Sequence, residues 1–86
     1  MATKLSAKLH ICGTERCGLL IVEPWAERIE LVDGKTYELT ATAEDQPWFE
    51  VEHKRNTVAV YVNGKSALFE LSCDGKVSRD ARTPSK

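Results

Sequence analysis

Residues 57–72 read TVAVYVNGKSALFELS, and this stretch decides the fold class of the chain. Apolar side chains recur at every second position on both sides of Asn63-Gly64; they are Val58, Val60, Val62, Ala67, Phe69 and Leu71. A period of two is typical of a β-strand with one buried face. Asn-Gly favours a two-residue hairpin turn, because that turn needs positive φ angles. The stretch therefore predicts a β-hairpin.

The preceding segment has the same design. Residues 27–32 (ERIELV) and 35–43 (KTYELTATA) flank Asp33-Gly34, which predicts a second tight hairpin. The second run directs one set of side chains inward, namely Tyr37, Leu39, Ala41 and Ala43. A third Asp-Gly pair, at residues 74–75, predicts another turn.

The rest of the chain also favours strands and turns. Strands are expected at residues 5–11, 19–23 and 48–54, with turns or loops at 12–18, 44–47 and Arg55-Asn56. No segment has ten or more residues of helical period. We therefore expect an all-β protein of six to seven short antiparallel strands, joined mostly by tight hairpins. The architecture is a small sandwich or a partly closed barrel.

The length of 86 residues predicts one domain with a small core. We place this domain at residues 1–77. Residues 78–86, SRDARTPSK, have neither periodicity nor a large apolar residue, so we expect a disordered basic tail.

Charge is unevenly distributed along the chain. Residues 23–53 carry nine acidic and two basic side chains, whereas the remainder carries ten basic and four acidic ones. Either this is a solvated surface, or it forms complementary faces that pair two copies head to tail or in a dimer.

Composition also bears on the compartment. No apolar run approaches the length of about 20 residues that spans a bilayer, and the N-terminal segment MATKLSAKLH has no apolar core of a secretion signal. The three cysteines are too few for a disulfide scaffold. We expect a cytoplasmic protein that does not enter the membrane.

Two Gly-Lys-Ser/Thr triplets, at residues 34–36 and 64–66, resemble the end of a phosphate-binding loop. That loop needs a second glycine five residues earlier, but Ile29 and Ala59 occupy those positions. Neither triplet opens a helical pattern, so the triplets are interpreted as turns and no nucleotide or other cofactor is expected.

A metal or redox site is an alternative. His10, Cys12 and Cys17 carry side chains that bind zinc, and Cys12 with Cys17 offers a thiol pair. The spacing is atypical, because one Cys-x4-Cys stands without a second cysteine pair. Cys73 shares the parity of Phe69 and Leu71, which indicates a small buried side chain.

Catalytic and nucleic-acid signatures are weak. His53 shares the parity of Phe49 and Val51, so we expect a partly buried imidazole rather than a general base. Glu50 and Glu52 share one strand face, where alternating glutamates usually keep an edge soluble. The aromatic residues of this region lie in the acidic segment, which would repel phosphates, so nucleic acid is not expected as a partner.

Two tryptophans, Trp25 and Trp48, each follow a proline at a strand boundary. Each either seals an end of the core, which the pattern favours, or anchors a contact, since tryptophan is enriched at binding hot spots. We expect a non-enzymatic protein-binding or assembly module, with a protein partner or itself as ligand. Its candidate contact residues are Trp25, Trp48, Glu50 and Glu52. The alternative is a zinc or thiol protein that uses the segment from His10 to Cys17.

Overall fold

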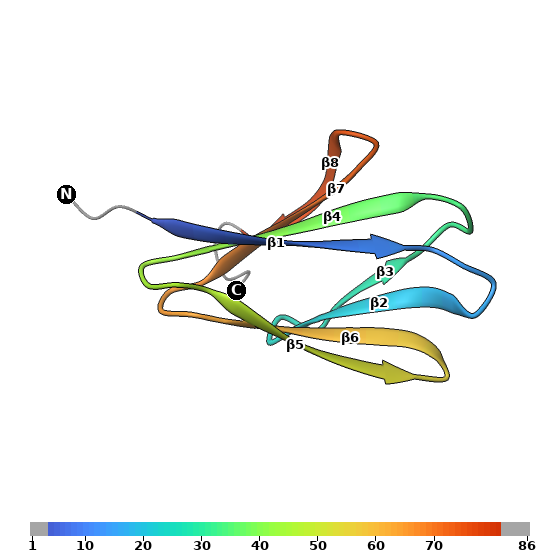
Figure 1. Cartoon of the computed structure of the whole chain (residues 1–86), viewed down its shortest axis with the longest axis horizontal. Helices are drawn as coiled ribbons and strands as arrows, with labels where there is room; N and C mark the ends of the chain where they lie inside the picture. The colour runs from blue at the N-terminus through green and yellow to red at the C-terminus, as the bar shows by residue number, and fades with distance from the viewer. Residues whose placement is uncertain (1–3, 82–86) are drawn as a thin grey trace.

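The computed structural model describes residues 4–81, with side chains for residues 4–76. These residues form strands and turns only, which confirms the predicted all-β class (Figure 1). The described residues contain no helix long and apolar enough to cross a membrane. The strands are β1 (Leu5–Cys12), β2 (Cys17–Glu23), β3 (Glu27–Glu30), β4 (Thr36–Ala43), β5 (Trp48–Lys54), β6 (Asn56–Asn63), β7 (Leu68–Cys73) and β8 (Lys76–Ala81).

Two sheets face each other as a sandwich, and they do not close into a barrel. We call the sheet with strand order β1-β4-β7-β8 sheet A, and the sheet with order β3-β2-β6-β5 sheet B. Figure 1 shows the two layers one above the other. Of the two predicted architectures, the sandwich is therefore the one that forms.

The core fills the space between the inner faces of the sheets. Sheet A contributes Leu39 and Leu71, and sheet B contributes Leu20, Val22 and Val60, all of them without solvent exposure. These residues lie at the alternating positions of their strands, so the pattern predicted which side chains point inward. The predicted inward sets of β4, β6 and β7 lie in this core; of them Ala67, just before β7, is only partly buried.

The Asp33-Gly34 and Asn63-Gly64 turns do not close hairpins, which corrects the prediction. β3 lies in sheet B and β4 in sheet A, and likewise β6 lies in sheet B and β7 in sheet A. Each turn therefore carries the chain from one sheet to the other. Gly34 has a positive φ of 88°, a conformation that favours glycine. The glycine is therefore needed for the turn, although the turn forms a crossing connection and not a hairpin.

Contacts between loops explain why these turns cross. The Gly13 N–H donates to the Lys35 carbonyl oxygen, and the Gly34 N–H donates to the Gly13 carbonyl oxygen, both over 2.9 Å. At the other end of the sandwich, the Glu44 N–H donates to the Lys65 carbonyl oxygen over 2.9 Å. Each of these crossing connections thus pairs with another crossing connection, in addition to hydrogen bonds of its own such as that from the Lys35 N–H to the Val32 carbonyl oxygen.

Other turns form hairpins as expected. Asp74-Gly75 joins β7 to β8 with positive φ at both residues, 55° and 81°, and Arg55-Asn56 joins β5 to β6. The prediction of purely antiparallel pairing is wrong at one place, because β2 and β6 run parallel in the middle of sheet B.

The predicted tail, residues 78–86, overlaps the last strand. Residues 78–81 continue β8, which pairs with β7 from Cys73↔Lys76 to Phe69↔Ala81. The tail boundary predicted at residue 78 therefore falls inside β8, because the Asp74-Gly75 turn returns the chain along the free edge of β7. Residues 82–86 lie outside the described residues.

Candidate interaction surface

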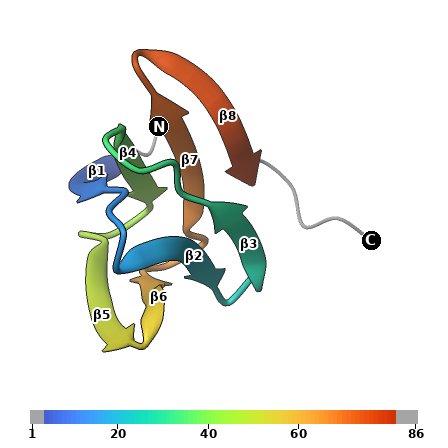
Figure 2. The same cartoon turned by 90° about the vertical axis from the view of Figure 1, so that its right-hand side faces the viewer.

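Two strand edges without a partner among the described residues lie on the same side of the sandwich. β1 pairs with β4 alone, and β5 pairs with β6 alone. Figure 2, which views the sandwich end-on, shows β1 and β5 together on one side and β8 and β3 on the other. Their free backbone N–H and C=O groups are able to pair with another strand.

An apolar groove of about 300 Å³ separates these two edges. Leu9 and Ile11 of β1 line one wall, and Val51 and His53 of β5 line the other. The groove exists because the edges of the two sheets do not cover each other, which leaves Val51 52% exposed although its side chain is on the inner face. We call the free edges of β1 and β5, together with this groove, the open side.

His53 also borders this groove and is exposed, contrary to the expected partial burial. The predicted parity is right, because His53 is paired with Val58, whose side chain lies in the core. The His53 side chain is nevertheless exposed, because β5 is an edge strand and no strand of sheet A covers the last residues of β5.

The outer face of sheet B exposes two aromatic side chains. Trp48 of β5 is 53% exposed and Tyr61 of β6 is 39% exposed. Trp48 is paired with Asn63 and Glu50 with Tyr61, so the two aromatic residues are diagonal neighbours on one face. Such neighbours lie about 7–8 Å apart, within reach of aromatic side chains.

Carboxylates flank this aromatic pair. In the β-ladder, Tyr61 lies between Glu50 of β5 and Glu23 of β2. Glu52 follows in the next row, opposite Ala59. We call the surface formed by Trp48, Tyr61, Glu23, Glu50 and Glu52 the aromatic–acidic face.

Three of the four predicted contact residues therefore lie together, and one does not. Trp48, Glu50 and Glu52 are on the outer face of β5. Trp25 lies in the turn between β2 and β3, where it packs against the core and its ring lies 4.8 Å from that of Phe69 in sheet A. Trp25 thus joins the two sheets, as a tryptophan that seals an end of the core would.

The alternative metal ligands are not assembled. His10 Nε2 lies 3.1 Å from Glu38 Oε2, and Cys12 Sγ lies 3.7 Å from Thr36 Oγ1, both toward the outside of sheet A. Cys17 instead packs against the core. Within residues that the structure describes, no group of three or more His, Cys, Asp or Glu side chains is placed to hold a metal ion. All three cysteines are free thiols.

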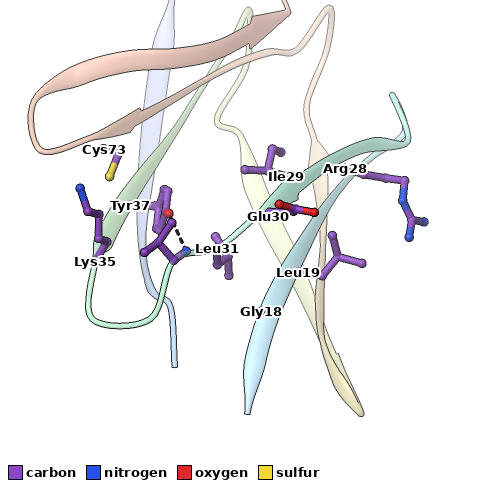
Figure 3. Close-up of a pocket in the computed structure, with 10 residues that line it drawn as sticks. Gly18, Leu19, Arg28, Ile29, Glu30, Leu31, Lys35, Tyr37 and Cys73 are labelled. Atoms are coloured by element: carbon purple, nitrogen blue, oxygen red, sulfur yellow. Dashed lines mark hydrogen bonds between the residues drawn. The ribbon is translucent and has the colours of Figure 1, made fainter. Parts of the chain in front are cut away.

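A second, larger hollow of about 930 Å³ lies at the opposite side of the sandwich. Figure 3 shows Tyr37 within it, with its hydroxyl oxygen accepting a 2.8 Å hydrogen bond from the Val32 N–H. Arg28, Glu30 and Lys35 bring charges of both signs to the hollow. Because the Tyr37 hydroxyl holds the β3–β4 connection, its role is structural.

Sequence reasoning missed Tyr61 and the groove. Tyr61 has the opposite parity to Val60 and Val62, and this was the available signal that it points outward. The groove had no such signal, because it depends on which strands become neighbouring edges of different sheets.

The chain was compared with protein-family models, curated proteins and solved structures, and nothing in these comparisons matches it.

Proposed function

We propose that this chain is a small non-catalytic, protein-binding module of the cytoplasm, which contacts its partner through the aromatic–acidic face. The observation that carries the proposal is the exposed pair Trp48 and Tyr61 between carboxylates. Exposed aromatic residues supply large contact area at low conformational cost, and they are enriched at binding hot spots. The flanking glutamates favour a partner segment that carries lysine or arginine.

Two further observations support this proposal. Among the buried residues of the described chain there is no charged side chain, and catalytic groups are usually tuned by burial beside other charges. Glu50, Glu52 and His53 are all exposed. The three free cysteines fit a reducing compartment such as the cytoplasm.

A peptide-display selection tests the proposal. The wild-type protein is the bait, and a variant with Trp48→Ser and Tyr61→Ser is the counter-selection bait. We expect enriched peptides that combine lysine or arginine with apolar residues, and we expect their affinity for the variant to fall by about ten-fold or more. Both replaced side chains are partly exposed, so the variant should keep a melting temperature close to that of the wild type.

Fluorescence gives an independent measurement. Trp25→Phe leaves Trp48 as the only tryptophan, and its emission should shift when a selected peptide binds. The matched variant Trp48→Phe retains Trp25 against Phe69 and should show no shift. Peptides that bind the wild type and the serine variant equally would contradict the proposed contact face.

A further inference from the structure

We propose that the open side is a self-association surface, on which the basic edge of β1 pairs with the acidic edge of β5 from a second copy of this chain. This inference rests on the proposed protein-binding function, because it names one partner for the module. It uses the strand edges and the groove and shares Glu50 and Glu52 with the aromatic–acidic face, whereas Trp48 and Tyr61 take no part in it.

The two edges differ in charge on their outer faces. β1 carries Lys8 and His10, whose side chains are 57% and 64% exposed. β5 carries Glu50 and Glu52 at alternating positions, followed on the same face by Lys54, and all three are exposed. Glu38 of β4 lies beside Lys8 and His10 on the side away from the free edge, so both remain accessible from that edge.

Pairing of like edges is unfavourable. If β5 paired antiparallel with β5 of a second copy about a two-fold axis, the register of greatest overlap would be centred on Val51. In it, Glu50 of each copy lies directly opposite Glu52 of the other. Like charges at directly opposed positions destabilise a strand pair. The same holds for β1 with β1, where Lys8 faces Lys8 or His10.

Pairing of unlike edges is compatible with a closed dimer. The arrows of β1 and β5 point in the same direction, and both edges lie on one side of the sandwich (Figures 1 and 2). A two-fold axis along the strands therefore places β1 beside β5 of the second copy, and at the same time β5 beside β1. Each contact occurs twice, and no edge of the open side remains free.

The groove sets the alignment of these edges. Leu9 and Ile11 face Val51 and His53 across it, so they lie at the same height along the strands. Rotation about an axis parallel to the strands keeps that height. Lys8 and His10 therefore come level with Glu50 and Glu52 of the second copy.

Apolar side chains reinforce the charged ones. Val51 is 52% exposed at the rim of the groove, and Leu5 at the start of β1 is 41% exposed. The second copy would cover Val51 and the groove together, which removes apolar surface from water and stabilises the dimer. Association then combines backbone pairing, opposite charges and apolar burial on one surface.

Charge reversal in two complementary variants tests this arrangement by sedimentation equilibrium at low salt. The first variant is Glu50→Lys with Glu52→Lys. The second is Lys8→Glu with His10→Glu and Glu38→Lys, which preserves the pairing within sheet A. We expect the wild type to dimerise and each variant alone to do so at least about ten-fold more weakly. An equimolar mixture of the two should recover dimers, because each β1 again meets an oppositely charged β5.

Controls make the outcome decisive. Glu30→Lys with Glu70→Lys changes the net charge as much as the first variant does, but on β3 and β7, and it should dimerise like the wild type. A wild-type chain that stays monomeric at every concentration would overturn the inference, as would a mixture that fails to recover dimers while both variants remain folded. Neither result would affect peptide binding by Trp48 and Tyr61, so the two proposals fail separately.

Discussion

Single side chains hold the crossing connections in place, and Tyr37 is the clearest example. It is 5% exposed, and its hydroxyl oxygen accepts the Val32 N–H at 2.8 Å. The tyrosine therefore joins β4 of sheet A to the segment that leaves sheet B. The alternating pattern of residues 35–43 placed this side chain inward but gave no indication that its hydroxyl has a partner.

Tyr37→Phe should lower the free energy of unfolding by about 1–3 kcal/mol, because the Val32 N–H loses its acceptor. Chemical denaturation followed by circular dichroism measures the change. Tyr61→Phe is the matched control, since Tyr61 is 39% exposed on the outer face of sheet B, and its effect should stay within about 0.5 kcal/mol. Equal effects of the two substitutions would show that the hydrogen bond does not hold the connection.

At the level of the elements, the connections between the two sheets determine which strands become neighbours. The β1–β2 connection packs so closely on the β3–β4 connection that a Cβ atom at Gly13 would meet the Val32 carbonyl carbon at 2.8 Å. Gly13 also makes backbone hydrogen bonds with Lys35 and Gly34. A residue with a side chain at position 13 would therefore separate the two connections.

Gly13→Ala should destabilise the protein by about 1–3 kcal/mol, because the opposing atoms are backbone and have little freedom to move. Gly18→Ala in β2 is the matched control. Its added Cβ would lie 3.7 Å from the nearest atom, so stability should be unchanged or rise by up to about 1 kcal/mol. Thermal unfolding of both variants checks the expectation, and a Gly13→Ala protein as stable as the wild type would show that the connections are not tightly packed.

In the whole molecule, the hydrophobic core between the two sheets stabilises the fold. The described structure has no disulfide among its three cysteines and no group of residues placed to hold a metal. Trp25 and Phe69 connect the sheets at one end of the core.

A chelator and a reducing agent should therefore leave the melting temperature of the purified protein unchanged, and native mass spectrometry should show monomer or dimer masses of the polypeptide without a metal ion. If a disulfide or a structural metal ion held so small a domain together, its removal would lower the free energy of unfolding by several kcal/mol. A fall of the melting temperature with chelator, or a stoichiometric zinc adduct, would instead favour the site at His10, Cys12 and Cys17.

The sequence alone determined the strands between residues 5 and 72 and the faces of those strands that point inward. Alternation in residues 35–43 and 57–62 identified the strands, and the same parity selected the buried Leu39, Val58 and Val60. The prediction from alternation succeeds because a strand directs successive side chains to opposite faces, whatever strand lies beside it. The same alternation placed Trp48, Glu50 and Glu52 on one face.

Only the tertiary structure decided which strands are neighbours. Asn63-Gly64 and Asp33-Gly34 specify a reversal of the backbone, and a hairpin and a crossing between sheets both satisfy that requirement. The choice depends on contacts between distant segments, such as Gly13 with Lys35 and Glu44 with Lys65. The parallel β2–β6 pair and the groove between β1 and β5 follow from that choice, and no local pattern encodes them.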